Sequence, residues 1–188
     1  TFIGWDASIH LAKYFDDEAH LFITDMNFVP GVGLVPSLEY RHSRLTMSGI
    51  ALSINSGNYI WKAEAASFWG MGFNNVKEKK FTTTEILLGT EYSGWSDTSL
   101  IIESGVKHFN DFDPLLEAEP DFQQEDRIAT TVNFMQDYYN QTLHLQILGT
   151  MIGEWGDDGG LNRVSLEYDV IDAFSIKGGG MIYQSGNS

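Results

Sequence analysis

Residues 58 to 73, NYIWKAEAASFWGMGF, alternate in chemical type over sixteen positions. Side chains two positions apart lie on the same side of an extended chain, so this alternation predicts a β-strand. At about 3.3 Å per residue the strand would be roughly 50 Å long, whereas strands of ordinary globular proteins have roughly three to ten residues. One side carries Tyr59, Trp61, Ala63, Ala65, Trp69, Met71 and Phe73, and the other carries Lys62 and Glu64.

The same alternation recurs in three later stretches, RIATTVNFMQDYY, TLHLQILGTMIGEW and NRVSLEYDV. In each stretch aliphatic and aromatic residues share one face, and the other face is charged or polar even at mid-strand, as at Glu167. A sheet with two such faces has water on one side and an apolar medium on the other.

Alternation alone does not say which medium the apolar face meets, because a soluble lipocalin-like barrel has the same period with its apolar face inward. Here the strands are long, and the apolar face carries Trp or Tyr near the strand ends. The middle of that face includes Ala and Gly, which would leave a soluble core poorly filled, whereas lipid chains close around them. These features favour a transmembrane β-barrel. The sequence contains no run of about twenty apolar residues, so we do not expect a membrane-spanning helix.

The predicted fold class is all-β, an antiparallel up-and-down barrel of about ten long strands. Short links alternate with longer ones, as in outer-membrane barrels with tight periplasmic turns and longer extracellular loops. On that assignment the first strand runs inward and the tenth ends outside, so we expect the chain to be part of a larger barrel. A complete ten-stranded barrel is the alternative. The predicted strands span residues 4–15, 20–29, 38–56, 58–73, 81–95, 98–110, 127–140, 141–156, 161–170 and 173–184.

Composition narrows the classes of function. The absence of Cys excludes a disulfide scaffold and a Cys-ligated zinc site. The formal net charge of −15, with no basic stripe to neutralise phosphates, argues against nucleic acid as a partner. We therefore expect residues 1–188 to form one barrel domain, or a fragment of one, with outer-membrane lipid as its partner. The oligomeric state stays open.

Residues 111–126 form an acidic segment that lacks the D-x-D-x-D-G order of an EF-hand. We expect an extracellular loop that is solvated or that binds divalent cations loosely. Pro114 and Pro120 flank a possible short helix, LLEAE, so the loop is expected to fold over the barrel mouth.

No catalytic or metal motif is visible. The five His residues lack the spacing of a metalloenzyme, and neither Ser48 nor Ser104 belongs to a G-x-S-x-G elbow. We therefore expect no enzymatic activity, no cofactor and no metal. A pair of catalytic carboxylates from separate strands is the alternative that spacing alone does not test. The five His residues are His10, His20, His42, His108 and His144.

Four sequence pieces support a resemblance to a known family: R-H-x-R-L at 41–45, W-K-x-E at 61–64, G-T-E-Y at 89–92 and the hairpin around 171–174. Residues 38–184 resemble the C-terminal half of the domain of unknown function 1302 family. The resemblance implies an outer-membrane β-barrel of Gram-negative bacteria, often associated with export systems of the resistance-nodulation-division type. Members of that family are longer at the N-terminus and continue to a further strand. The resemblance implies no catalytic residues.

The leading hypothesis is a bacterial outer-membrane protein that acts as a channel, porin-like or export-associated, for small or lipophilic solutes. The alternatives are a soluble lipocalin-like barrel that binds an apolar ligand and a structural or adhesion barrel without transport. Mixed signs on the polar face predict salt-bridge ladders that stiffen the wall and narrow a pore. Predicted to line the lumen are Lys62, Glu64, Glu85, Glu91, Glu103, Lys107, Arg127, Asp137, His144, Arg163, Glu167 and Asp169. Predicted to face lipid are Trp61, Ala63, Leu100, Ile102, Val132, Leu145, Leu166 and Ile176.

Overall fold

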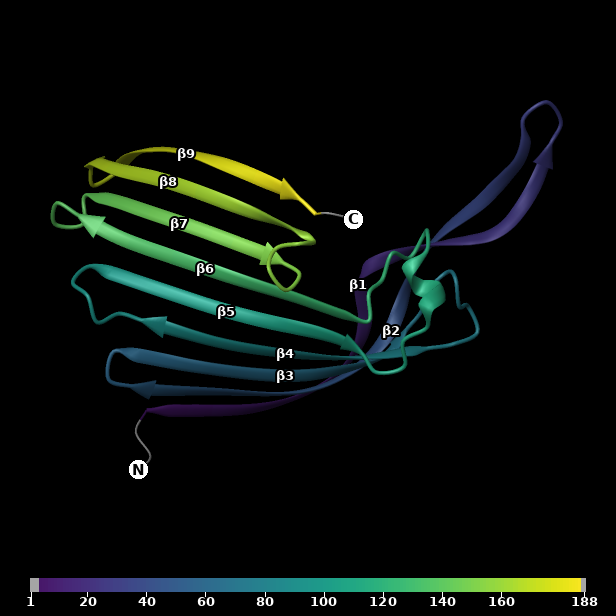
Figure 1. The fold of residues 1–188 in the computed structure, drawn as a ribbon, viewed down its shortest axis with the longest axis horizontal. Helices are drawn as coiled ribbons and strands as arrows, with labels where there is room; N and C mark the ends of the chain where they lie inside the picture. Colours follow the sequence, from purple (N-terminus) through teal and green to yellow (C-terminus); the bar gives the residue numbers. More distant parts are fainter. Residues whose placement is uncertain (1–3, 187–188) are drawn as a thin grey trace.

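A computed structural model describes residues 4–186, with side chains for all of these except residues 18–21. Nine strands form one antiparallel up-and-down sheet in chain order, as Figure 1 shows, which confirms the predicted all-β class. Among the described residues no helix is long and apolar enough to cross a membrane. The strands are β1 (Trp5–Val29), β2 (Gly33–Ser56), β3 (Tyr59–Met71), β4 (Phe81–Tyr92), β5 (Thr98–Phe109), β6 (Asp126–Tyr138), β7 (Leu143–Ile152), β8 (Gly159–Ile171) and β9 (Phe174–Ser185), and one 3-10 helix, η1 (Pro114–Glu117), precedes β6.

The first two predicted strands are one strand. The acidic residues 16–18, which suggested a turn, lie in a β-bulge between Phe15 and Ala19. β2 is nearly as long and supplies a partner there, and the His42 ring Nδ1 donates a hydrogen bond to the Asp16 carbonyl at 2.6 Å. The sheet therefore has nine strands, and β1 begins at the end that carries the short turns, opposite to the predicted direction.

The two ends of the sheet differ. The tight turns after β2, β4, β6 and β8 lie at the left of Figure 1, and the longer loops 72–80, 110–125 and 153–158 lie at the right. We call these the short-turn end and the long-loop end. β9 ends at the long-loop end, as expected. Among residues 4–186, β1 pairs only with β2 and β9 only with β8, so the sheet does not close on itself.

The two faces differ in chemistry and in exposure. Direct cross-strand partners share a face, so the register assigns each side chain to one of them. The face with the aliphatic and aromatic residues is the more exposed, with Leu88 at 59% and Leu166 at 46%. The polar face is the more shielded, with Thr83 at 0% and Ser165 at 9%. We call the apolar face the outer face and the polar face the inner face. All eight residues predicted to face lipid lie on the outer face.

The end of β3 departs from the predicted alternation. Gly70 has a φ of +109°, and the register shifts between Trp69 and Met71. A Cβ at Gly70 would lie 2.6 Å from the Arg44 carbonyl oxygen, so only glycine fits without displacement. This bulge shifts the alternation by one residue, so the side chains after it lie on the opposite face. Met71 and Phe73 are therefore buried on the inner face. The prediction that they share the face of Trp69 was wrong.

The main hydrophobic cluster lies on the inner face at the long-loop end. Its rings pack closely, with centroids 5.5 Å apart for Phe73 and Phe81 and 5.7 Å apart for Phe73 and Phe109. Leu116 of η1, in loop 110–125, packs onto these rings and is fully buried. Burying each such side chain stabilises the fold by about 1.5–3 kcal/mol. The members of this apolar cluster are Leu45, Met71, Phe73, Phe81, Phe109 and Leu116.

The acidic segment is folded down onto the neighbouring loop. The Asp121 carboxylate accepts hydrogen bonds from the backbone N–H groups of Asn74 at 2.9 Å and Asn75 at 2.7 Å. The Asn75 amide in turn donates to the carbonyls of Leu115 at 2.8 Å and Ala118 at 2.9 Å. The short helix expected between the two prolines is η1. Loops 72–80 and 110–125 together cover the end of the inner face.

The outer parts of β1 and β2 continue past these loops as a two-stranded ribbon, which projects from the sheet in Figure 1. At its base the Lys77 ammonium donates to the Ile23 carbonyl at 2.6 Å, and the Ile23 N–H donates to the Asn74 side chain at 3.3 Å. Residues 30–32 form its turn. We call residues 22–42 the ribbon.

Candidate functional site

The inner face gathers the residues singled out from the sequence. The register places all twelve predicted lumen-lining residues on it, although they come from six different strands. The twelve residues share this face because side chains alternate strictly between the two faces along β3 to β8, except at the bulge near the end of β3. That they line a lumen stays a prediction.

A hollow of about 690 Å³ lies on the inner face towards the long-loop end, beside the apolar cluster. It exists because one row of cross-strand neighbours has small residues between larger polar ones. The row runs from His10 of β1 through Gly49 and Ala66 to Glu85, Lys107 and Arg127. Gly49 and Ala66 carry no side chain larger than a methyl group, and Gly105 and Ala129 continue the floor in the next row.

Among the described residues, the charged groups around this hollow form no close ion pairs with one another. Within the described part of the chain, no ion pair shorter than 4 Å joins Glu85 to Lys107 or Arg127. The Lys107 ammonium lies instead 5.4 Å from the centre of the Phe109 ring, in cation–π geometry. Direct neighbours on a sheet have Cβ atoms about 5 Å apart, so Lys107 and Arg127 present two adjacent positive groups. The hollow can therefore contact a charged or polar solute directly.

A predicted ladder of charges is present nearer the short-turn end. Lys62 Nζ lies 3.9 Å from Glu91 Oε2, and both side chains are about one third exposed. Glu103 lies in the same row as Lys62, with only Gly89 between them. The ladder thus extends over three strands, but its one measured ion pair is long and partly hydrated.

A tighter polar network crosses β6 to β9 at the short-turn end. His144 Nδ1 lies 2.7 Å from Asp137 Oδ1, and His144 Nε2 lies 3.2 Å from Asp169 Oδ2. In the same row Lys177 Nζ contacts Glu167 Oε2 at 3.0 Å. Lys177 was missed in the sequence because its role follows from lying directly opposite Glu167, and pairing register is not visible in β9 alone.

Arg163 belongs to a third group at mid-sheet. Its Nη2 donates to Gln146 Oε1 at 3.0 Å, and Gln146 Nε2 donates to Asn133 Oδ1 at 3.1 Å. Arg163 Nε is buried and has no hydrogen-bond partner. The two amide side chains are further functional candidates that charge-based reasoning passed over.

The histidines do not form one site. His108 lies on the outer face with Asp126 at 2.8 Å, His42 binds a carbonyl near the ribbon, and the side chain of His20 lies outside the described residues. In the part of the chain that the structure describes, no group of three His, Asp or Glu side chains could hold a metal ion.

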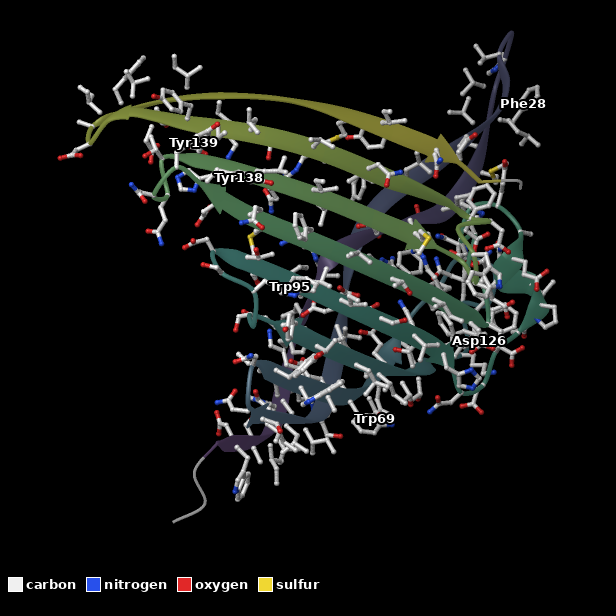
Figure 2. All side chains as sticks on the ribbon, turned by 60° about the vertical axis from the view of Figure 1, so that its left-hand side comes forward. Phe28, Trp69, Trp95, Asp126, Tyr138 and Tyr139 are labelled. Atoms are coloured by element: carbon white, nitrogen blue, oxygen red, sulfur yellow. The ribbon has the colours of Figure 1, made fainter. Side chains whose placement is uncertain are left out.

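Aromatic side chains gather on the outer face at the short-turn end. Tyr59 stacks on Trp61 with ring centroids 5.6 Å apart and contacts Tyr92 at 4.7 Å, and Tyr92 contacts Trp95 at 4.8 Å. Figure 2 shows Trp95 at this end, together with Tyr138 and Tyr139, and Trp69 towards the other end. The outer face therefore has aromatic residues near both of its ends.

No protein-family model, no curated protein and no solved structure matches this chain. The resemblance to the domain of unknown function 1302 family stays a prediction from the sequence.

Proposed function

We propose that this chain forms the wall of a bacterial outer-membrane β-barrel that acts as a channel, porin-like or export-associated. One observation carries the proposal: most large apolar side chains of the outer face are exposed, whereas the charged side chains gather on the opposite, inner face, where most of them are partly shielded. A soluble protein gains stability by the reverse arrangement, because removing apolar surface from water is worth about 25 cal/mol per Å². Contiguous exposed apolar surface beyond a few hundred Å² marks a membrane or an interaction site.

The dimensions of the strands support this proposal. β3 to β9 have ten to thirteen residues each, and a membrane-spanning β-strand needs about 9–11 when tilted by about 45°. Tight turns at one end, longer loops at the other and aromatic residues near both ends of the apolar band are also features of such barrels.

The inner face supports a transport role. Its twelve candidates include seven acidic and four basic residues, an excess of three negative charges when His144 is counted as uncharged. The hollow offers charged groups and apolar side chains such as Leu87 and Ile152 to a small solute, and the loops over the apolar cluster cover the long-loop end of the inner face. Membership of the domain of unknown function 1302 family and association with a resistance-nodulation-division type export system rest on the sequence resemblance alone.

The lipocalin-like alternative needs the apolar face to be the inner one, so the exposures favour the membrane wall. The structural or adhesion alternative shares the membrane wall and differs only in transport. Two experiments therefore separate the three hypotheses.

The first experiment compares adjacent residues on opposite faces, Leu145→Arg and Gln146→Arg. Arg at mid-depth on a lipid-facing position costs about 2–4 kcal/mol, so Leu145→Arg should block assembly, measured as loss of heat-modifiable migration in outer-membrane fractions. Gln146→Arg is the matched control and should assemble. Equal tolerance of the two changes would contradict the membrane wall.

The second experiment measures conductance and reversal potentials in planar bilayers. We expect cation preference at low ionic strength that fades as the Debye length falls from about 10 Å at 0.1 M to about 3 Å at 1 M. Anion preference, or no conductance from demonstrably inserted protein, would favour the structural barrel.

A further inference from the structure

The outer end of the ribbon is apolar and uncharged. Residues 26–38, MNFVPGVGLVPSL, carry no charged side chain in a protein with a net charge of −15. Phe28 is 71% exposed, Val32 74% and Leu34 65%. Figure 2 shows Phe28 far from the sheet, and within the described residues β1 contacts no element other than β2. We call residues 26–38 the tip.

Both faces of the tip carry exposed apolar side chains, although Asn27, the partner of Val35, and Ser37 lie on one of them. Phe28 and Leu34 are cross-strand partners and share one face. Val35, the next residue, lies on the opposite face, and Val32 lies in the turn at the extreme end. A flat protein partner would cover one face and leave the other in water. A surrounding apolar medium covers both.

We infer that this tip inserts into a lipid bilayer. A second copy of the chain fits less well, because stable protein interfaces bury about 1,200–2,000 Å² in total and two narrow hairpins meet over one face each. The missing charge also fits hydrocarbon, which accepts apolar side chains and disfavours ionised ones.

The backbone of the tip suits shallow insertion. Phe28 pairs with Leu34 and Val29 with Gly33, and the Val32 N–H donates to the Val29 carbonyl at 3.0 Å across the turn. Pro30 has no N–H group to satisfy. Within residues 4–186, the backbone groups that point outward from the two-stranded ribbon have no strand partner, and an unsatisfied group costs several kcal/mol in the bilayer core, so insertion is limited to the interfacial depth of about 5–10 Å.

Charged residues mark where insertion would stop. Asp25 lies opposite Ser37, and Arg41 Nη2 binds Glu39 Oε2 at 2.7 Å. The hydrogen bond from Arg41 holds the pKa of the Glu39 carboxyl below its ordinary value, so the pair stays charged. The uncharged tip extends about 20 Å beyond Asp25 at roughly 3.3 Å per residue, and interfacial segments enter about 5–10 Å. The tip is long enough to bury Val32 and Phe28 while these charges stay in water.

The test uses site-specific fluorescence, which the chain permits because it has no Cys. Val32→Cys carries an environment-sensitive fluorophore at the extreme end of the tip, and Ser37→Cys carries it at the base of the tip, opposite Asp25, as the control. The purified protein is diluted from detergent into neutral phosphatidylcholine vesicles. We expect lipids with a nitroxide on the acyl chain to quench the label at position 32 at least about twofold more than that at position 37. Because the tip is uncharged, the difference should persist at about 1 M salt.

A charge tests the same point in protein that carries the label in the tip at Leu34→Cys. Val32→Asp should lower acyl-chain quenching of that label at least about twofold, because an ionised carboxylate resists entry into hydrocarbon. Ser37→Asp adds the same charge at the level where Asp25 already stands, and its carboxylate can still accept the hydrogen bond from the Asn27 amide. It should leave the quenching unchanged. Equal effects of the two substitutions would overturn the inference.

A third label, at Leu166→Cys on the outer face, separates this inference from the membrane wall. Quenching at position 166 with none at position 32 would overturn the tip insertion and leave the wall intact. Quenching at position 32 with none at position 166 would support the tip insertion and contradict the membrane wall. Shielding of the label at position 32 that depends on protein concentration and not on lipid would assign the tip to a second copy and overturn the inference.

Discussion

The apolar cluster and the apolar outer face are built from the same residue types, yet they have opposite surroundings. Phe81 and Leu88 belong to the same strand, β4, but Phe81 is fully buried on the inner face and Leu88 is exposed on the outer face. The difference arises at the long-loop end, where loops 72–80 and 110–125 fold over the inner face. Within the described residues no segment covers the outer face. Strand alternation thus sets the face of a side chain, and the connecting loops decide whether that face is covered.

The largest expected effect tests this contrast directly. Phe81→Ala removes a fully buried ring and leaves a cavity under the loops, so we expect a loss of about 3–5 kcal/mol in the free energy of unfolding. Leu88→Ala on the same strand should cost less, because detergent or lipid closes around the shortened side chain. Urea unfolding in detergent micelles measures both. A larger loss for Leu88→Ala would mean that the outer face is packed against protein.

A substitution in the bulge at Gly70 should have the second-largest effect on the free energy of unfolding. Gly70→Ala places a Cβ against the Arg44 carbonyl at a positive φ, strain that costs about 1–3 kcal/mol. It should also loosen Met71 and Phe73 within the apolar cluster. Gly105→Ala is the control, since a Cβ there would meet its nearest atom at 3.7 Å, and it should be nearly neutral. The same urea titration compares them, and equal losses would contradict the strain argument.

The hydrogen bonds between the loops should have a smaller effect. Asp121→Ala leaves the backbone N–H groups of Asn74 and Asn75 without their acceptor, so we expect a loss of about 1–3 kcal/mol. Limited proteolysis should then cut loop 110–125 faster. Glu125→Ala, at an exposed position of the same loop, is the control and should change neither quantity. Unchanged proteolysis of Asp121→Ala would show that the apolar cluster alone holds the loops.

The smallest effect concerns the charged inner face. Lys62 and Glu91 are 3.9 Å apart and partly exposed, so a double-mutant cycle to alanine should give a coupling energy below about 1 kcal/mol. The free energies of unfolding of the wild type, the two single variants and the double variant supply that coupling energy. A coupling several-fold larger would indicate an inner face much drier than this open sheet provides.

The candidate site was predictable where alternation stays regular. Glu85, Lys107 and Arg127 could be assigned to one face because β4, β5 and β6 alternate from end to end. The apolar cluster could not be assigned in the same way. It depends on the bulge at Gly70 and on Leu116, which reaches it from a loop.

The sequence by itself determined the hairpin order, the strand type and the chemistry of each face, because these depend on side chains two positions apart in one segment. Tertiary structure alone decided that residues 5–29 form one strand, since the extended partner in β2 stabilises an acidic stretch that reads as a turn. It also decided the cross-strand pairs such as Glu167 with Lys177, the small-residue floor of the hollow and the projection of the ribbon. Register, bulges and loop packing arise from contacts between segments distant in sequence, and period-two alternation within one segment does not contain them.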